Sequence, residues 1–201
     1  MQRLRRLPTS TFAVSILLSR TTTGSRSGSG IFDANYASGG LPNLTLVRFM
    51  HDHTGSFGTA IDKVNTPERD VADNDYAVGL LVQKISNSPI YSNNTLIFVV
   101  EDDAQDGGDH MDSHRTTAYV AGAYVKNAVV STPYTTLNFV RTMEEVLGLP
   151  PMNLNDALAA PMSDIFSTTP STATPAAILY CSQLPLPQPG MPCNDPTPNA
   201  K

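Results

Sequence analysis

The stretch that decides the fold covers residues 95–103 and reads TLIFVVEDD. Its first part, up to Val100, is an unbroken run of apolar and β-branched residues, which is typical of a strand that is buried on both faces. Such strands are frequent in parallel sheets, because helices cover both faces of those sheets. The run ends in Glu101, Asp102 and Asp103, so acidic groups follow the predicted strand at its C-terminal end.

Two further strands are predicted on either side of this stretch. Residues 44–49 (LTLVRF) and residues 117–122 (TAYVAG) combine apolar and β-branched residues over the length of a short strand. The first of them leads directly into the segment MHDHT at residues 50–54. Side chains that can bind metals therefore follow two of the predicted strands.

Two helices are expected, one between the first two strands and one after the third. The first begins at Thr66-Pro67, with proline at the first helical position, and Ser88-Pro89 ends it. The second opens at Thr135 and closes at Gly148. The apolar faces are expected to comprise Ala72, Tyr76, Leu80 and Ile85 in the first helix and Phe139, Val140, Met143 and Leu147 in the second. This order predicts the fold class α/β, with a largely parallel sheet flanked by helices and ligands beyond the C-terminal strand ends.

The composition favours one globular domain with irregular ends. The chain has 201 residues, of which 40% are hydrophobic and 15% are charged, and this length allows one core of ordinary size. We expect a flexible or signal-like segment in residues 1–30, an α/β domain in residues 31–166 and a proline-rich tail in residues 167–201. The net charge of −5 disfavours nucleic acid and an anionic membrane as partners, because both select a basic face.

The N-terminal segment predicts a periplasmic or secreted protein. Arginines among the first residues precede the short apolar run FAVSILL at residues 12–18, an order that imitates a secretory signal peptide. No run approaches the roughly 18 apolar residues that cross a bilayer. Cys181 and Cys193 lie in the tail, where an exported protein would form a disulfide and a cytosolic protein would keep two thiols.

The four histidines of the chain fall in two short stretches, His51 and His53 in the first and His110 and His114 in the second. The aspartates beside them are Asp52, Asp102, Asp103, Asp106, Asp109 and Asp112. Imidazole and carboxylate are ligands of zinc, manganese and iron, and a cation offsets the repulsion among so many carboxylates. The pattern predicts a divalent-metal site, and the alternative is a solvated acidic loop with histidines in turns.

Two further residues are candidates for substrate binding. Arg115 follows the second histidine stretch, and its planar fork could clamp a phosphate or pair with a loop aspartate. Asn74 lies inside the first predicted helix, where a polar residue costs helix propensity. It either faces a substrate or belongs to the solvated face of that helix.

Residues 98–116 (FVVEDDAQDGGDHMDSHRT) resemble the metal-binding segment of the bacterial phosphoesterase family within the alkaline phosphatase superfamily. The resemblance covers residues 31–162 and includes the matching segments 41–54, 72–75 and 141–152. It is similar to the branch that is often fused to a β-propeller domain. The resemblance implies an alkaline-phosphatase-like fold and the hydrolysis of a small phosphoester.

The resemblance also implies a set of metal ligands. Asp102 and Asp103 would be adjacent ligands at a strand end, and His114 would complete that part of a two-metal centre. Asp52 and His53 would serve the second metal. The implied cofactor is a divalent metal, with zinc first and manganese, iron or calcium as alternatives.

The resemblance is incomplete at the N-terminus. In the superfamily, a Ser or Thr nucleophile and the first metal-binding acid lie upstream of the equivalent of Ile31, and residues 1–30 do not resemble that segment. We therefore expect a partial domain whose missing half belongs to another segment or polypeptide, and the nucleophile stays unassigned. The expected function is a metal-dependent phosphoester hydrolase, and the alternative is a catalytically inactive metal-binding or interaction remnant of such an enzyme.

Overall fold

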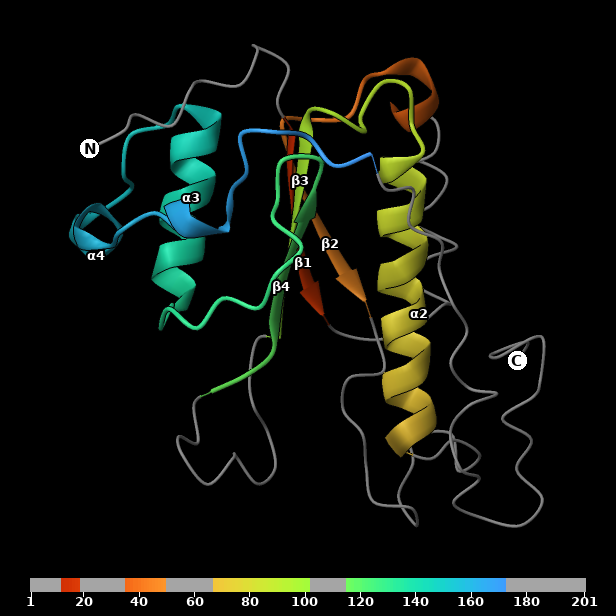
Figure 1. Cartoon of the computed structure of the whole chain (residues 1–201), viewed down its shortest axis with the longest axis horizontal. Helices are drawn as coiled ribbons and strands as arrows, with labels where there is room; N and C mark the ends of the chain where they lie inside the picture. The colour runs from red at the N-terminus through yellow and green to blue at the C-terminus, as the bar shows by residue number, and fades with distance from the viewer. Residues whose placement is uncertain (1–11, 19–34, 50–66, 102–114, 173–201) are drawn as a thin grey trace.

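The computed structural model describes residues 12–18, 35–49, 67–101 and 115–172, and Figure 1 draws the rest of the chain as a thin grey trace. The strands are β1 (Phe12–Leu18), β2 (Leu44–Phe49), β3 (Thr95–Glu101) and β4 (Ala118–Gly122). The helices are α2 (Pro67–Ser86), α3 (Thr136–Leu147) and α4 (Leu154–Leu158), followed by a 3-10 turn at Ser163–Ile165.

Most of these elements occupy the predicted residues. β2 spans the predicted range, β3 also includes Glu101, and β4 begins one residue later than predicted. α2 begins at Pro67, as its sequence indicates. α3 ends before Gly148, which adopts the left-handed conformation with a φ of 71° and donates its N–H to the carbonyls of Glu144 and Glu145. The local predictions are confirmed because breakers and caps act within one turn of a helix.

The described strands form one sheet in the order β2-β1-β3-β4. β1 lies between β2 and β3 and runs parallel to both, whereas β3 and β4 run antiparallel. Residues 12–18, which the sequence favours as the apolar part of a signal-like segment, therefore contribute a strand. The backbone of β1 joins two strands that have no direct pairing with each other.

The predicted fold class, a largely parallel and alkaline-phosphatase-like sheet that is incomplete at the N-terminus, is wrong. The sheet is small, and the two strands whose side chains are described throughout, β3 and β4, form an antiparallel pair. The chain reverses direction between Glu101 and Ala118, and the Glu101 N–H donates to the Thr117 carbonyl at 3.4 Å. An apolar run can form a strand in a parallel or an antiparallel sheet. The chain connection between two strands therefore determines their relative direction, which the run alone does not.

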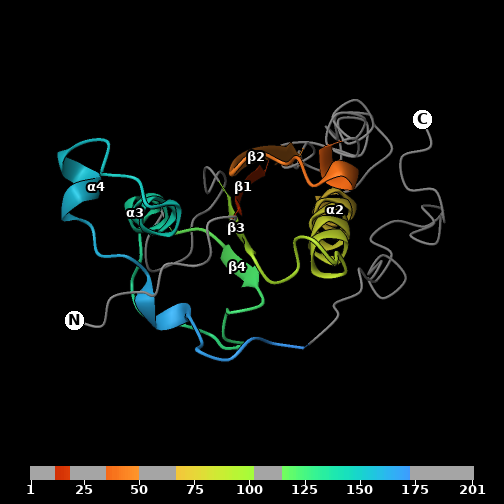
Figure 2. The same cartoon turned by 90° about the horizontal axis from the view of Figure 1, so that it is seen from above.

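Helices α2 and α3 lie on opposite sides of β3 (Figure 2). Ile97 and Val99 belong to the apolar cluster that includes α2, and the alternate residues Leu96 and Phe98 belong to the cluster that includes α3. The rings of Phe98 and Phe139 meet edge to face, with centroids 5.8 Å apart. β3 is therefore buried on both faces, as predicted. Only one of its two neighbours, β1, is parallel to it, because β4 runs antiparallel.

The buried face of α2 differs from the predicted apolar face. Ala77 and Ile85 are buried and Leu81 packs against them, whereas Leu80, which was expected on that face, is 45% exposed. The buried positions follow the spacing of three and four residues that places side chains on one helix face. Asn74 lies three residues before Ala77 and is 8% exposed. The buried face of α2 therefore continues toward its N-terminus as far as this asparagine.

Candidate functional site

The C-terminal ends of β2 and β3 lie level with each other at one edge of the sheet. Leu18, the last residue of β1, pairs with Phe49 on one side and with Glu101 on the other. Neighbouring strands lie about 4.8 Å apart, so the two ends are separated by about 10 Å across β1. The histidine and aspartate stretches that follow Phe49 and Glu101 in the sequence therefore begin at the same edge.

The predicted metal ligands themselves lie outside the described residues. This applies to Asp52, His53, Asp102, Asp103 and His114, and the structure neither confirms nor contradicts their roles. Within residues 12–18, 35–49, 67–101 and 115–172, no group of three or more His, Cys, Asp or Glu side chains is placed to hold a metal ion. Cys181 and Cys193 also lie outside these ranges.

Asn74 is a buried polar side chain of α2. It shares the sheet-facing side of α2 with Ala77 and Leu81, so the alternative of a solvated face is wrong. In Figure 1 the N-terminal end of α2 lies at the same end of the domain as the arrowheads of β1 and β2. No hydrogen bond joins the Asn74 amide to another residue that the structure describes.

A polar contact joins the two sides of the second stretch. The Thr116 hydroxyl donates a hydrogen bond to the Glu101 carboxylate, which is half-buried at the end of β3. Arg115 is exposed next to Thr116. The contact keeps the chain segments before Asp102 and after His114 close together. The sequence did not predict this pairing, since neither residue type nor spacing identifies a hydroxyl partner for one carboxylate among several.

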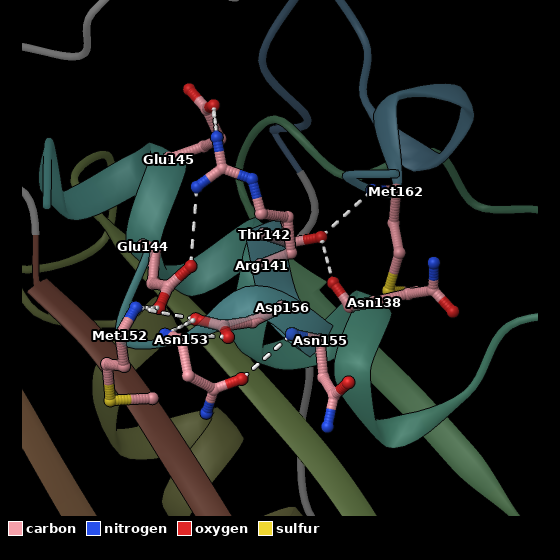
Figure 3. A network of polar contacts seen from close by, with 10 residues as sticks. All are labelled: Asn138, Arg141, Thr142, Glu144, Glu145, Met152, Asn153, Asn155, Asp156 and Met162. Carbon is pink, nitrogen blue, oxygen red and sulfur yellow. Dashed lines mark hydrogen bonds and ion pairs between the residues drawn. The ribbon is translucent and has the colours of Figure 1, made fainter. Parts of the chain in front are cut away.

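A second polar network lies between α3 and α4 and was not predicted (Figure 3). Glu144 and Asp156 are 3% and 1% exposed, and their carboxylates both accept the Met152 N–H, at 3.1 and 2.6 Å. Asp156 also accepts the Asn153 N–H at 3.0 Å. Burial raises the pKa of Asp156, but its side-chain interaction with Glu144 and hydrogen bonds from the backbone amides of Met152, Asp156 and Asn153 outweigh burial and hold that pKa below its usual range.

The same network extends along α3. Arg141 pairs with Glu144 at 3.3 Å and with Glu145. Thr142 is fully buried, donates its hydroxyl to the Asn138 carbonyl at 2.6 Å and accepts the Met162 N–H at 2.9 Å. Each buried polar group in this network has a partner inside the fold, so the network holds α4 and the following chain on α3.

Asp164 forms a third polar cluster, near the end of the described chain. Its carboxylate accepts the hydroxyls of Thr132 at 2.6 Å and Tyr134 at 2.5 Å, and its carbonyl accepts the Lys126 ammonium at 2.6 Å. The hydrogen bonds from Thr132 and Tyr134 lower the pKa of Asp164. Burial, followed by the hydrogen bond and the charge of Asp164, raises the pKa of Tyr134 to about 12.

We expect Tyr134 to titrate above the ordinary pKa of a tyrosine side chain. Because its pKa is raised from 10.0 to about 12, its contribution to stability is fully present below pH 10 and is lost as the pH rises toward 12. The phenolate absorbance of the chain, minus that of Tyr134→Phe, measures this titration. Asp164→Asn removes the neighbouring charge and should lower the pKa, and an unchanged titration in that variant would contradict the assignment.

No family model, curated protein or solved structure matches the chain. Among the described residues, no helix combines the length and the hydrophobicity that crossing a membrane requires.

Proposed function

We propose that the protein is a metal-dependent phosphoester hydrolase. The observation that carries the proposal is the level alignment of Phe49 and Glu101 on the two sides of Leu18. Two sequence stretches rich in histidine and aspartate begin directly after these strand ends. Residues that directly follow two level strand ends start close together at one edge of the sheet, so the alignment supports one shared site for both stretches.

The donor groups of the two stretches suit a divalent metal. Asp52 and His53 would supply ligands from the first stretch. Asp102, Asp103 and His114 would supply ligands from the second. This mixture of carboxylate and imidazole fits zinc, with manganese, iron or calcium as the alternatives. Such a metal supplies Lewis-acid polarisation of a phosphoryl group when it is bound.

Arg115 and Asn74 are the proposed substrate-binding residues. A guanidinium group matches the geometry of two phosphoryl oxygens, and Arg115 is exposed beside the second stretch. Asn74 is 8% exposed, and buried polar side chains such as its amide are stabilised by hydrogen-bond partners. A phosphoryl oxygen would accept its N–H groups. This chemistry, together with the burial of Asn74, supports it as a contact to the substrate.

We also propose a substrate class, a partner and a cellular environment for this function. The substrate is a small phosphoester, and neither nucleic acid nor a membrane is a partner. Another segment, which supplies the nucleophile or a β-propeller domain, is the expected protein partner. The environment is the periplasm or the outside of the cell.

Metal binding and hydrolysis test the proposal directly. We expect the chain to bind zinc in isothermal titration and to hydrolyse an aryl phosphate with added zinc or manganese, and chelation should remove this activity. In Asp102→Asn, zinc affinity and hydrolysis should fall by at least about 100-fold, because a neutral amide is a poor metal ligand. Asp75→Asn, an exposed change on α2, is the matched control and should behave as the parent chain.

The outcomes separate the two functional hypotheses. Tight zinc binding without hydrolysis would favour the inactive remnant over the enzyme. The absence of zinc binding would contradict the hydrolase and a metal-binding remnant, and would leave an interaction remnant as the alternative. Equal losses of zinc affinity in Asp75→Asn and Asp102→Asn would contradict the role of Asp102 as a metal ligand.

A further inference from the structure

Helix α4 buries a charged side chain and exposes apolar ones, which is the opposite of an ordinary surface helix. Its buried residue is Asp156, at 1% exposure, while Leu154 and Leu158 are 71% and 77% exposed. A surface helix normally turns its apolar side chains toward the core and its charged side chains toward water. Leu154 and Leu158 are four residues apart and therefore lie on the same side of α4.

Two more exposed apolar side chains lie within five residues of Leu154 in the sequence. Leu149 is 53% exposed and Met152 is 74% exposed in the segment that leads from α3 into α4. We call these four residues, Leu149, Met152, Leu154 and Leu158, the α4 apolar surface. Scattered single apolar residues are ordinary on a protein surface, but a concentration of this kind usually marks a contact with another molecule.

Buried hydrogen bonds hold the α4 apolar surface in place (Figure 3). Asp156 accepts the N–H groups of Met152 and Asn153 from inside the fold. The Asn153 side chain caps α4 by accepting the Asn155 N–H at 2.9 Å. Glu144 fixes Met152 from α3. The apolar side chains are therefore displayed by a segment whose backbone is already ordered, which reduces the entropy lost on association.

The charge of this segment indicates what covers the surface. Residues 146–163 (VLGLPPMNLNDALAAPMS) contain one ionisable side chain, Asp156, and it is buried. In a two-fold symmetric contact, residues near the axis meet their own copies, so an exposed charge there would face a like charge. The chain carries a net charge of −5, and an uncharged surface avoids that repulsion. An anionic membrane or nucleic acid would instead require basic side chains.

We propose that two copies of this chain associate through the α4 apolar surface in a two-fold symmetric dimer. Exposed leucine and methionine side chains from both copies would bury each other, with the charged parts of the chain kept away from the axis. Because four side chains per copy make a small interface, the dimer should be weak, with a dissociation constant on the order of 10 µM. The inference is independent of the proposed hydrolase function.

Sedimentation velocity on the full chain tests this dimer. Between about 1 and 200 µM, we expect the mean mass to rise from 21.5 kDa toward twice that value. Leu158→Glu places like charges across the contact and should weaken association by at least about 10-fold. Val129→Glu is the matched control, since Val129 is 95% exposed outside the α4 apolar surface, and it should associate like the parent chain.

The result that would overturn the dimer is a parent chain that stays monomeric over the whole range. Undiminished association of Leu158→Glu would also overturn it, as would an equal loss in Val129→Glu. Circular dichroism checks the fold of each variant, and Leu154→Glu provides a second change on the same surface.

Discussion

Replacing Phe98 with alanine should lower the free energy of unfolding by about 3–5 kcal/mol. Phe98 is fully buried in β3 and packs edge to face on Phe139 of α3, so the substitution removes a large apolar side chain and an aromatic contact and leaves a cavity. Proteins of this size are stable by about 5–15 kcal/mol. The loss would therefore be a large fraction of the total, and urea unfolding followed by circular dichroism measures it.

Tyr119→Ala is the matched control for Phe98→Ala. Tyr119 is an aromatic residue of the neighbouring strand β4, but it is 64% exposed, and its truncation should cost less than about 1 kcal/mol. Equal losses in the two variants would contradict the packing of α3 on the buried side of β3.

Replacing Gly122 with alanine should destabilise the protein by about 1–3 kcal/mol. Gly122 pairs with Leu96 where β4 runs antiparallel to β3. A Cβ atom at Gly122 would lie 2.7 Å from Leu96 Cδ2 and 2.9 Å from the Thr95 carbonyl oxygen. Leu96 and Thr95 are both buried, so the sheet must shift to admit the methyl group. Thermal unfolding measures the loss.

Ala118→Val is the control for Gly122→Ala in the same strand. Ala118 is exposed, so the larger side chain meets open space and should change stability by less than about 0.5 kcal/mol. If Gly122→Ala were as harmless as this control, the antiparallel register of β3 and β4 would be incorrect.

The elements of this fold follow closely from local sequence patterns. Proline at the start of α2, glycine after α3 and the β-branched runs of β2 and β3 each act on their own neighbours in the chain. The resulting boundaries agree with the structure to within a residue or so. The apolar face of α2 was less accurately predicted, because Leu80 suits either side of a helix and only the position of the sheet selects one.

The arrangement of the strands was not available from those patterns. The run at residues 12–18 suits a signal segment as well as a strand, and only pairing with β2 and β3 distinguishes the two. The direction of β4 depends on how the chain returns after Glu101. The burial of Asp156 in α4 was not predicted, because hydropathy alone indicates that an aspartate is exposed. Its burial depends on the backbone amides of Met152 and Asn153, which donate hydrogen bonds to its carboxylate.

The position of the candidate site was predicted in part. The sequence places the histidine and aspartate stretches behind two strands, but it does not say that these strands end level with each other. That alignment comes from the pairing of Leu18 with Phe49 and Glu101. A position on the solvated face of α2 was one of two interpretations of Asn74. Its burial could not be inferred, because the sequence does not show which side of α2 faces the sheet.

Strand β1 has a consequence for any mutational search of this protein. It contains no histidine or acidic residue, yet it separates β2 from β3 and fixes their offset along the sheet. A one-residue slip of β1 would displace one strand end relative to the other by about 3.3 Å and turn its side chains to the opposite face. A screen confined to the histidines and aspartates would therefore overlook a spacer on which their mutual distance depends.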